Sequence, residues 1–344
     1  MAMPRLFFED FTPGLTQVYG PVQVSRDDII AFAREYDPQP FHIDEVAAKN
    51  TFVGALIASG WHSCSILMRL IAEGFLLDAS SMGAPGVEFV KWVQPVRPGD
   101  TLRAKVTVLE SKASKSRPTI GLVRFHFELL NQSDEVVLVQ SNWIMFGRRD
   151  APWPPAPVER PTRPAVNQRC PEGPALAPIS SDEVASPYLE DLVPGRMDEL
   201  GSYTFTADRI IHFAKQFDPQ PFHLDEEAAR RSLFGGLCAS GWHTASVWMK
   251  LILSYREVQA TEARRRGERP AQLGPSPGFK NLKWLKPVYA GDTLTYRATL
   301  IDKRVSASRP GWGIASHRHT AKNQHGECVF EFEGTVFWER RPGS

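Results

Sequence analysis

Apolar residues recur with helical spacing between residues 26 and 36, where one face of the predicted helix carries Ile29, Ile30, Phe32, Ala33 and Tyr36. Ser25 precedes this helix as an N-cap, and Asp28 occupies the third helical position as its capping-box partner. The pattern ends at the Asp37-Pro38 turn, and a second short helical piece is predicted around residues 44–49. An amphipathic helix therefore leads the chain into a polar turn.

The stretch that begins at Gly60 is apolar on most sides, as is typical of a helix enclosed by other structure. Alternating apolar and polar positions then predict strands at residues 87–92, 102–109, 120–130 and 136–146. One buried helix followed by a run of antiparallel strands indicates an α+β fold, in which a sheet wraps around a helix.

This pattern occurs twice because the chain contains an internal repeat. Residues 37–44 (DPQPFHID) return as residues 218–225 (DPQPFHLD), at an offset of 181 residues. Farther along, residues 98–102 (PGDTL) correspond to residues 290–294 (AGDTL) at an offset of 192, so the second half carries 11 additional residues. We therefore expect two domains, residues 1–150 and 181–344.

Two segments fall outside the repeat. The insertion lies near residues 261–272 and contains the run RRRGER at 264–269. We expect a solvated loop there, and the alternative is a clamp on the phosphates of coenzyme A. Residues 151–180 are rich in proline, which predicts an extended, semi-rigid linker between the domains.

Composition and charge narrow the classes of function. The 344 residues, 42% hydrophobic and 23% charged, are typical of a globular protein, and a net charge of +1 gives no global attraction for nucleic acid. No apolar run is long enough to span a bilayer or to act as a secretory signal, so we expect a cytoplasmic protein without a membrane partner. Because the cysteines at 64, 170, 238 and 328 lack CxxC spacing, free thiols are expected.

The repeated motif resembles that of the MaoC-like acyl dehydratases, a hotdog-fold family that includes the (R)-specific enoyl-CoA hydratases. The family pattern D-x-N-P-x-H stands at residues 37–42 and again at 218–223, with Gln in place of Asn. A small-residue helix start, ASG, follows at 58–60 and at 239–241. The resemblance covers nearly all of both halves and implies a double hotdog. In that fold two antiparallel sheets each wrap around a long central helix and pack as a pseudo-dimer with the central helices side by side.

The resemblance also implies a chemistry. Adding water across the C2=C3 bond of an enoyl thioester requires a base for the water, an acid for C2 and donors for the thioester oxygen. In the family, the Asp and the His handle the water and the protons. The first amides of the central helix lack intrahelical partners, so they can donate hydrogen bonds to the thioester oxygen. The catalytic candidates are Asp37, His42, Gly60, Asp218, His223 and Gly241.

Further repeated residues are candidates for binding the substrate. Gln39 and Gln220 replace the usual Asn, which affects how the acyl chain is held. The phosphates of coenzyme A could be bound by the arginine-rich insertion or, alternatively, by Lys91, Lys283, Arg117 and Arg309. Packing is favoured over ligand contact for His62, His243, Trp61 and Trp242. Hydratase relatives support the Asp with a serine on the central helix, whereas Met68 and Met249 stand at the corresponding positions.

A purely structural interpretation of the motif stays open. Asp37 before Pro38 is a common turn former, and His42 fits a partly buried core position. The repeated octapeptide, however, differs between the halves only at Ile43 and Leu224, while the predicted strands differ freely. That contrast favours a functional motif.

Three functions compete: an (R)-specific enoyl-CoA hydratase or 3-hydroxyacyl-CoA dehydratase, a hotdog thioesterase, and a non-catalytic acyl-CoA binding module. A branched or dicarboxylic enoyl-CoA such as mesaconyl-CoA is among the candidate substrates. No metal or organic cofactor is expected, because no cluster has ligand spacing and no glycine-rich phosphate loop follows a strand. The expected partners are the acyl-CoA and a second copy in a homodimer. Two competent sites are predicted, unless the insertion reshapes one pocket.

Overall fold

The computed structural model describes residues 3–51, 53–154, 170 and 186–343, and, apart from η2 of the first half, the two halves contain the same elements in the same order. The first half comprises η1 (Phe8–Asp10), β1 (Thr16–Gln23), α1 (Arg26–Tyr36), α2 (Pro40–Ile43), α3 (Glu45–Lys49), α4 (Gly60–Ile71), η2 (Ala72–Leu76), β2 (Gly86–Trp92), β3 (Thr101–Ala113), β4 (Ile120–Leu130) and β5 (Val136–Gly147). The second half comprises η3 (Leu189–Asp191), β6 (Met197–Thr204), α5 (Ala207–Phe217), α6 (Pro221–Leu224), α7 (Glu226–Arg230), α8 (Gly241–Arg265), β7 (Gly278–Trp284), β8 (Thr293–Val305), β9 (Trp312–Lys322) and β10 (Cys328–Glu339). Most of the predicted linker lies outside the described residues.

The strands form one continuous antiparallel sheet. Its ten strands run in the order β1-β3-β4-β5-β2-β7-β10-β9-β8-β6, so each half contributes five neighbouring strands. The halves meet where β2 pairs with β7, with Val87 opposite Leu282. This pairing covers one open edge of each five-stranded sheet and joins the two expected sheets into one.

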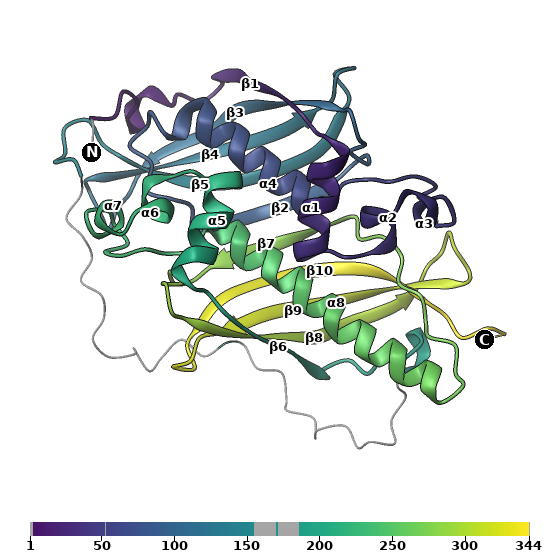
Figure 1. Ribbon diagram of the computed structural model, residues 1–344. Coiled ribbons are helices and arrows are strands. Elements are labelled where there is room, and N and C mark those ends of the chain that lie inside the picture. The colour runs from purple at the N-terminus through teal and green to yellow at the C-terminus, as the bar shows by residue number, and fades with distance from the viewer. Residues whose placement is uncertain (1–2, 52, 155–169, 171–185, 344) are drawn as a thin grey trace.

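The helices gather on one face of the sheet, where α4 and α8 lie side by side (Figure 1). Trp61 of α4 and Trp248 of α8 meet edge to face, with ring centroids 5.5 Å apart. The buried side chains of both helices and of the inner sheet face belong to one hydrophobic cluster that spans both halves. The predicted pseudo-dimer is therefore confirmed.

Local sequence explains most of these elements. Ser25 caps α1 and exchanges hydrogen bonds with Asp28, as the capping box predicts. In β4 buried and half-buried positions alternate, because only one face of the strand meets the core. The strand β1 was not predicted, since its residues are nearly all exposed and Pro21 interrupts them. The short helix α2 was also missed, because the pattern there indicated only a turn.

The first part of the insertion is helical up to residue 265 and only the remainder is a loop, which corrects the expectation of a loop throughout. The helix α8 continues unbroken to Arg265, whereas α4 stops at Ile71 and gives way to the π-helical turn η2. Arg264 pairs with Glu257 at 3.0 Å, and Arg265 pairs with Glu262 at 2.8 Å. These ion pairs occupy the arginines on the surface of α8, so part of the insertion lengthens the helix.

The cysteines also differ from expectation. Cys170 and Cys328 form a disulfide that ties the segment between the halves to β10, whereas free thiols were predicted. The prediction failed because the two residues are 158 positions apart, and no local spacing reveals such a pair. Cys64 and Cys238 are free and buried. Within the described ranges, no helix combines the length and the apolar character needed to cross a membrane.

Candidate active site

The first copy of the motif is held by the end of one helix and the start of another. Asp37 is the C-cap residue of α1, and Pro40 occupies the first turn of α2, where a missing N–H costs nothing. His42 follows on α2, so two short turns bring the carboxylate and the imidazole together. Both side chains are buried, with 2% of Asp37 and 4% of His42 exposed.

The imidazole has one nitrogen fixed by the backbone. The Nδ1 atom of His42 lies 2.7 Å from the carbonyl oxygen of Ile57, which only accepts, so Nδ1 carries a proton and donates it. The Nε2 atom faces Asp37 Oδ2 at 3.5 Å. The carbonyl of Ile57 therefore turns the reactive nitrogen toward the carboxylate.

Two further side chains orient the carboxylate. Gln39 Nε2 donates to Asp37 Oδ1 at 2.8 Å, and the Ser59 hydroxyl donates to Asp37 Oδ2 at 2.6 Å. Ser59 is also the N-cap of α4 and accepts a hydrogen bond from the Trp61 amide. Met68 cannot donate a hydrogen bond to the Asp37 carboxylate, and Ser59 does so instead. Ser59 was noted in the sequence only as part of a helix start. Its place as an N-cap serine next to the motif could have identified it.

Close packing against Trp92 requires a glycine at the start of α4. A Cβ on Gly60 would lie 2.4 Å from the Trp92 ring, and Trp92 Nε1 donates to the Gly60 carbonyl at 3.0 Å. Any side chain at residue 60 would displace this indole. Trp92 and Gly60 together form part of the wall beside the motif.

The second copy repeats these contacts closely. His223 Nε2 lies 3.4 Å from Asp218 Oδ2, and His223 Nδ1 lies 2.7 Å from the Cys238 carbonyl oxygen. Ser240 and Gln220 donate to the Asp218 carboxylate at 2.6 and 2.9 Å. At the helix start, a Cβ on Gly241 would lie 2.2 Å from the Trp284 ring.

The charges of this second pair stabilise each other. Burial alone would lower the pKa of His223, but the Asp218 carboxylate raises it to about 10. Burial likewise opposes ionisation of Asp218, while His223, Ser240 and Gln220 together hold its pKa below the usual value. At neutral pH the pair is an imidazolium beside a carboxylate.

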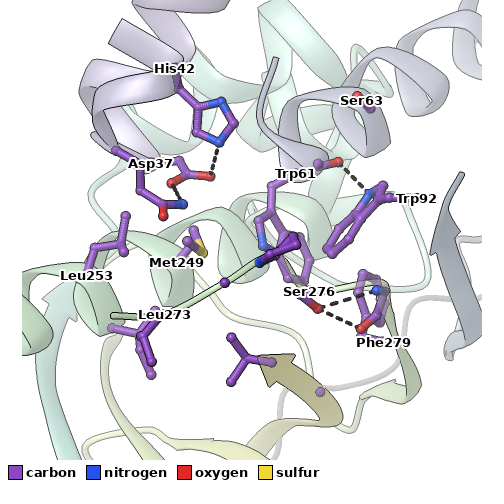
Figure 2. A pocket seen from close by; sticks show the side chains of 18 of the residues that line it. Asp37, His42, Trp61, Ser63, Trp92, Met249, Leu253, Leu273, Ser276 and Phe279 are labelled. Atoms are coloured by element: carbon purple, nitrogen blue, oxygen red, sulfur yellow. Dashed lines mark hydrogen bonds and ion pairs between the residues drawn. The ribbon is translucent and has the colours of Figure 1, made fainter. Parts of the chain in front are cut away.

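A cavity of about 380 Å³ distinguishes the two copies. Asp37, Gln39, His42 and Gly60 line it on the side of the first half. The opposite wall comes from the second half and includes the α8 residues Trp248, Met249, Ile252, Leu253 and Arg256. Figure 2 shows Asp37 and His42 on one side of this space, with the α8 side chains across from them. The first motif therefore opens into a pocket that is mostly walled by the other repeat.

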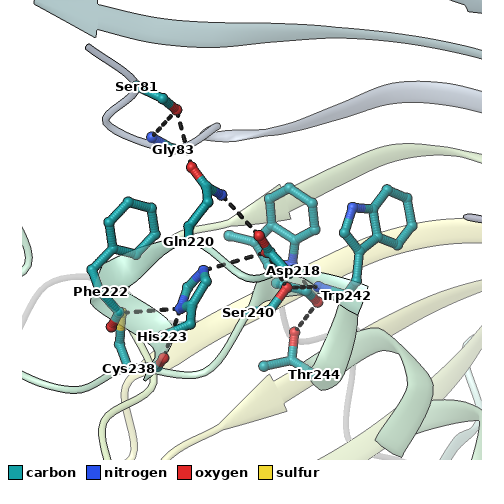
Figure 3. Close-up of polar contacts among 12 residues, drawn as sticks. Ser81, Gly83, Asp218, Gln220, Phe222, His223, Cys238, Ser240, Trp242 and Thr244 are labelled. Carbon is teal, nitrogen blue, oxygen red and sulfur yellow. Dashed lines mark hydrogen bonds and ion pairs between the residues drawn. The ribbon is translucent and has the colours of Figure 1, made fainter. Parts of the chain in front are cut away.

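Residues of the first half and of the segment around α6 and α7 pack against the second motif. The Ser81 hydroxyl donates to Gln220 Oε1 at 3.2 Å (Figure 3). Phe222 packs against Phe234, with ring centroids 4.9 Å apart. In the first half the residue equivalent to Phe234 is the smaller Val53, which lines the cavity. Asp218, Gln220 and His223 line neither the large cavity nor the smaller one beside Arg256 in the described part of the chain.

The other repeated histidines and tryptophans occupy core positions. His62 stacks on Phe32 with centroids 4.6 Å apart, and His243 stacks on Phe213 at 4.7 Å. Burial lowers the pKa of His62 to about 4 and that of His243 to about 3, so both rings are neutral. Trp61 stacks on Phe279 and also lines the cavity, whereas Trp242 meets Trp284 edge to face.

The candidate phosphate ligands lie away from this cavity. Lys91 and Lys283 are exposed where β2 meets β7, and Lys283 is paired with Glu331 at 2.6 Å. Arg117 is exposed between β3 and β4, and Arg309 stacks on the Phe337 ring between β8 and β9. None of the four lines the cavity, so their role as phosphate ligands stays a prediction. Among the described residues, no group of three or more His, Cys, Asp or Glu could hold a metal ion.

The sequence matches the MaoC-like domain family twice, over residues 12–123 and 194–323. The chain belongs to this family. Each match includes one copy of the Asp-His motif and the start of one central helix. The MaoC-like double hotdog is therefore the framework on which both motifs sit.

Relatives and solved structures agree with this framework. A β-methylmalyl-CoA dehydratase of Chloroflexus aurantiacus is 28% identical over 98% of both chains. A mesaconyl-CoA hydratase of Cereibacter sphaeroides is 42% identical over 76 residues, which are 22% of this chain and 21% of that protein. A solved Chloroflexus aurantiacus structure, described as a MaoC domain dehydratase, superposes with a TM-score of 0.75 at 20% identity over 99% of both chains. A Mycobacterium tuberculosis protein with a double hotdog fold gives 0.69 at 15% identity, covering 96% of this chain and 98% of that chain.

Proposed function

We propose that this MaoC-like protein is a hydro-lyase that adds water to an enoyl-CoA, or removes it from the 3-hydroxyacyl-CoA. The observation that carries the proposal is the Asp37-His42 pair, buried and hydrogen-bonded, at the wall of an apolar cavity. The names of the dehydratase and hydratase relatives support the same class of reaction.

The geometry suits activation of one water molecule. Asp37 Oδ2 and His42 Nε2 are 3.5 Å apart and border the same cavity, so a single water can contact both. In the hydration direction the pair takes a proton from this water as its oxygen bonds to C3, and a proton is delivered to C2. The amide at the start of α4 offers a donor to the thioester oxygen, which gains negative charge in the transition state.

We infer that the two motifs are unequal and that Asp37 and His42 carry the turnover. Both are chemically complete, which favoured two competent sites from the sequence. Among the described residues, however, the first borders the large cavity and the second does not, and Ser81 and Phe234 pack against the second. The buried pair of Asp218 and His223 then serves mainly to hold the α5–α6 turn against α8.

Incubation with crotonyl-CoA tests the reaction class. Loss of the enone absorbance with formation of 3-hydroxybutyryl-CoA is the expected outcome. Release of free thiol would indicate the thioesterase instead. Tight binding without either change would indicate the acyl-CoA binding module and overturn the proposed function.

Three expectations remain with this proposal. The domains are assigned to residues 1–150 and 181–344, with residues 151–180 as the linker. The cytoplasm is the expected location, because coenzyme A thioesters are the proposed substrates. A homodimer of the whole chain is expected, and light scattering on the eluting protein measures its mass directly.

A further inference from the structure

The lining of the large cavity includes buried polar nitrogens that have no hydrogen-bond partner among the described residues. Arg256 Nε, His319 Nδ1 and Trp248 Nε1 are buried and lack hydrogen bonds within the described chain, and all three residues line the cavity. Tryptophan and arginine side chains only donate, so this lining calls for an acceptor. Buried donors without partners cost free energy, which a bound acceptor would recover.

These groups lie at two places along α8. His319 meets the Trp248 ring at a centroid distance of 4.5 Å, and the Arg256 guanidinium lies 4.6 Å from the centre of the Trp338 ring. Trp248 and Arg256 are eight residues apart on one face of α8, about 12 Å along its axis. Ile252 lies between them and gives the cavity an apolar middle.

The charge of Arg256 is not matched by a carboxylate in the large cavity. Asp37 is the acidic residue on its lining, and it belongs to the motif. Asp198 borders the smaller neighbouring cavity, where burial lowers the pKa of Arg256 and the Asp198 charge opposes that shift, and Asp198 Oδ1 also pairs with Arg196 at 3.2 Å. Arg256 itself donates to the neutral Gln259 side chain at 2.7 Å. Burial lowers the pKa of His317, next to this group, to about 3, so that residue adds no competing charge.

In the first half, the residues equivalent to Arg256, His317 and His319 line no part of this cavity. The repeat places Phe75 at the position of Arg256, Phe125 at that of His317 and Phe127 at that of His319. All three phenylalanines are buried, and their rings contact one another within the core. Polar residues therefore replace a filled aromatic core only in the half that walls the pocket.

We propose that Arg256 binds a carboxylate at the end of the acyl group. The reaction itself rests on the proposed function, whereas this inference assigns the class of acyl chain: one that ends in a carboxylate. The guanidinium fork binds a carboxylate through two parallel hydrogen bonds, and the apolar middle of the cavity accepts the intervening methylene groups.

Matched substrates test the assignment with the variants Arg256→Met and Arg256→Lys. The wild-type protein is expected to prefer glutaconyl-CoA over 2-pentenoyl-CoA, which has the same chain length but ends in a methyl group. For Arg256→Met, kcat/KM for glutaconyl-CoA falls roughly 10- to 100-fold while that for 2-pentenoyl-CoA is unchanged. Arg256→Lys keeps the charge but loses the fork, so its loss is smaller.

Arg230→Met is the control, because it removes the same charge from an exposed ion pair on α7 and should leave both rates unchanged. An equal fall with both substrates, or no fall, would overturn the assignment. If the wild-type protein hydrates no enoyl-CoA, the proposed reaction fails, and calorimetry with glutaryl-CoA and valeryl-CoA decides the carboxylate site alone. Tighter binding of glutaryl-CoA that is lost in Arg256→Met supports the site, and equal binding of the two thioesters excludes it.

Discussion

The two copies of the Asp-His motif have nearly identical contacts but different surroundings. In both, serine and amide side chains hold the carboxylate, and a backbone carbonyl holds the imidazole. Among the described residues, the first copy lines the cavity of about 380 Å³ and the second does not, and the wall of that cavity opposite the motif belongs to the second half. In the proposed function the local motif supplies the chemistry, whereas residues distant in sequence determine which copy borders the cavity.

Exchanging the two aspartates one at a time gives the largest expected contrast. Asp37→Asn should lower kcat/KM by about 10²- to 10⁴-fold, because it removes an acid-base group. Asp218→Asn should leave turnover within about twofold, since the second motif borders no part of the large cavity. Steady-state kinetics measure both, with thermal unfolding as the control for folding. Half of the activity remaining in each variant would show two working sites.

Exchanging the residues that open and close the motifs tests the cause of the difference. Val53→Phe copies the second half and should lower kcat/KM roughly 10-fold or more, because the ring fills space that the cavity wall leaves free. Phe234→Val should leave activity unchanged and cost about 1 kcal/mol of stability through its lost contact with Phe222. An unaltered rate in Val53→Phe would show that Val53 lies away from the acyl path.

Substitutions of the two buried histidines, His62 and His243, should have the same effect on stability in both halves. The pKa values of His62 and His243, about 4 and 3, lie below the ordinary value, so the unfolded chain takes up these protons first as the pH falls. Each histidine therefore lowers the free energy of unfolding below about pH 6.5, by about 2 kcal/mol at pH 5. His62→Phe and His243→Phe should each remove that loss. Chemical denaturation at pH 7 and pH 5 measures it, and an unchanged difference between the two pH values contradicts the assignment.

Much of the fold followed from the sequence because it depends on local patterns. The capping box at Ser25 and the alternation in β4 each specify an element through neighbouring residues. The strand β1 did not, since its partner β3 lies about 90 residues away and its own residues are exposed. The helical part of the insertion was missed because its arginines indicate solvent exposure equally well for a loop and a helix.

Local sequence also predicted the part of the site that lies within the repeated motif. The repeated octapeptide identified Asp37 and His42, and the geometry brings them together beside a cavity. The contact of the first half with the second motif was not predictable, because Ser81 reaches Gln220 across 139 residues of sequence. Arg256 had no motif to mark it, and its meaning depends on the cavity and on its aromatic counterpart Phe75.

The pairing of β2 with β7 also sets an order of events during synthesis. Strand β2 ends at Trp92 and its partner begins at Gly278, so 186 positions separate completion of one from arrival of the other. At about 5–20 residues per second, the nascent first half presents an unpaired edge for roughly 10 to 40 seconds. Unpaired edges invite pairing with other chains, and neighbouring ribosomes on one message supply identical ones. Lys91 is exposed on this edge and places there a charge, unpaired among the described residues, of the kind that opposes such pairing until β7 arrives.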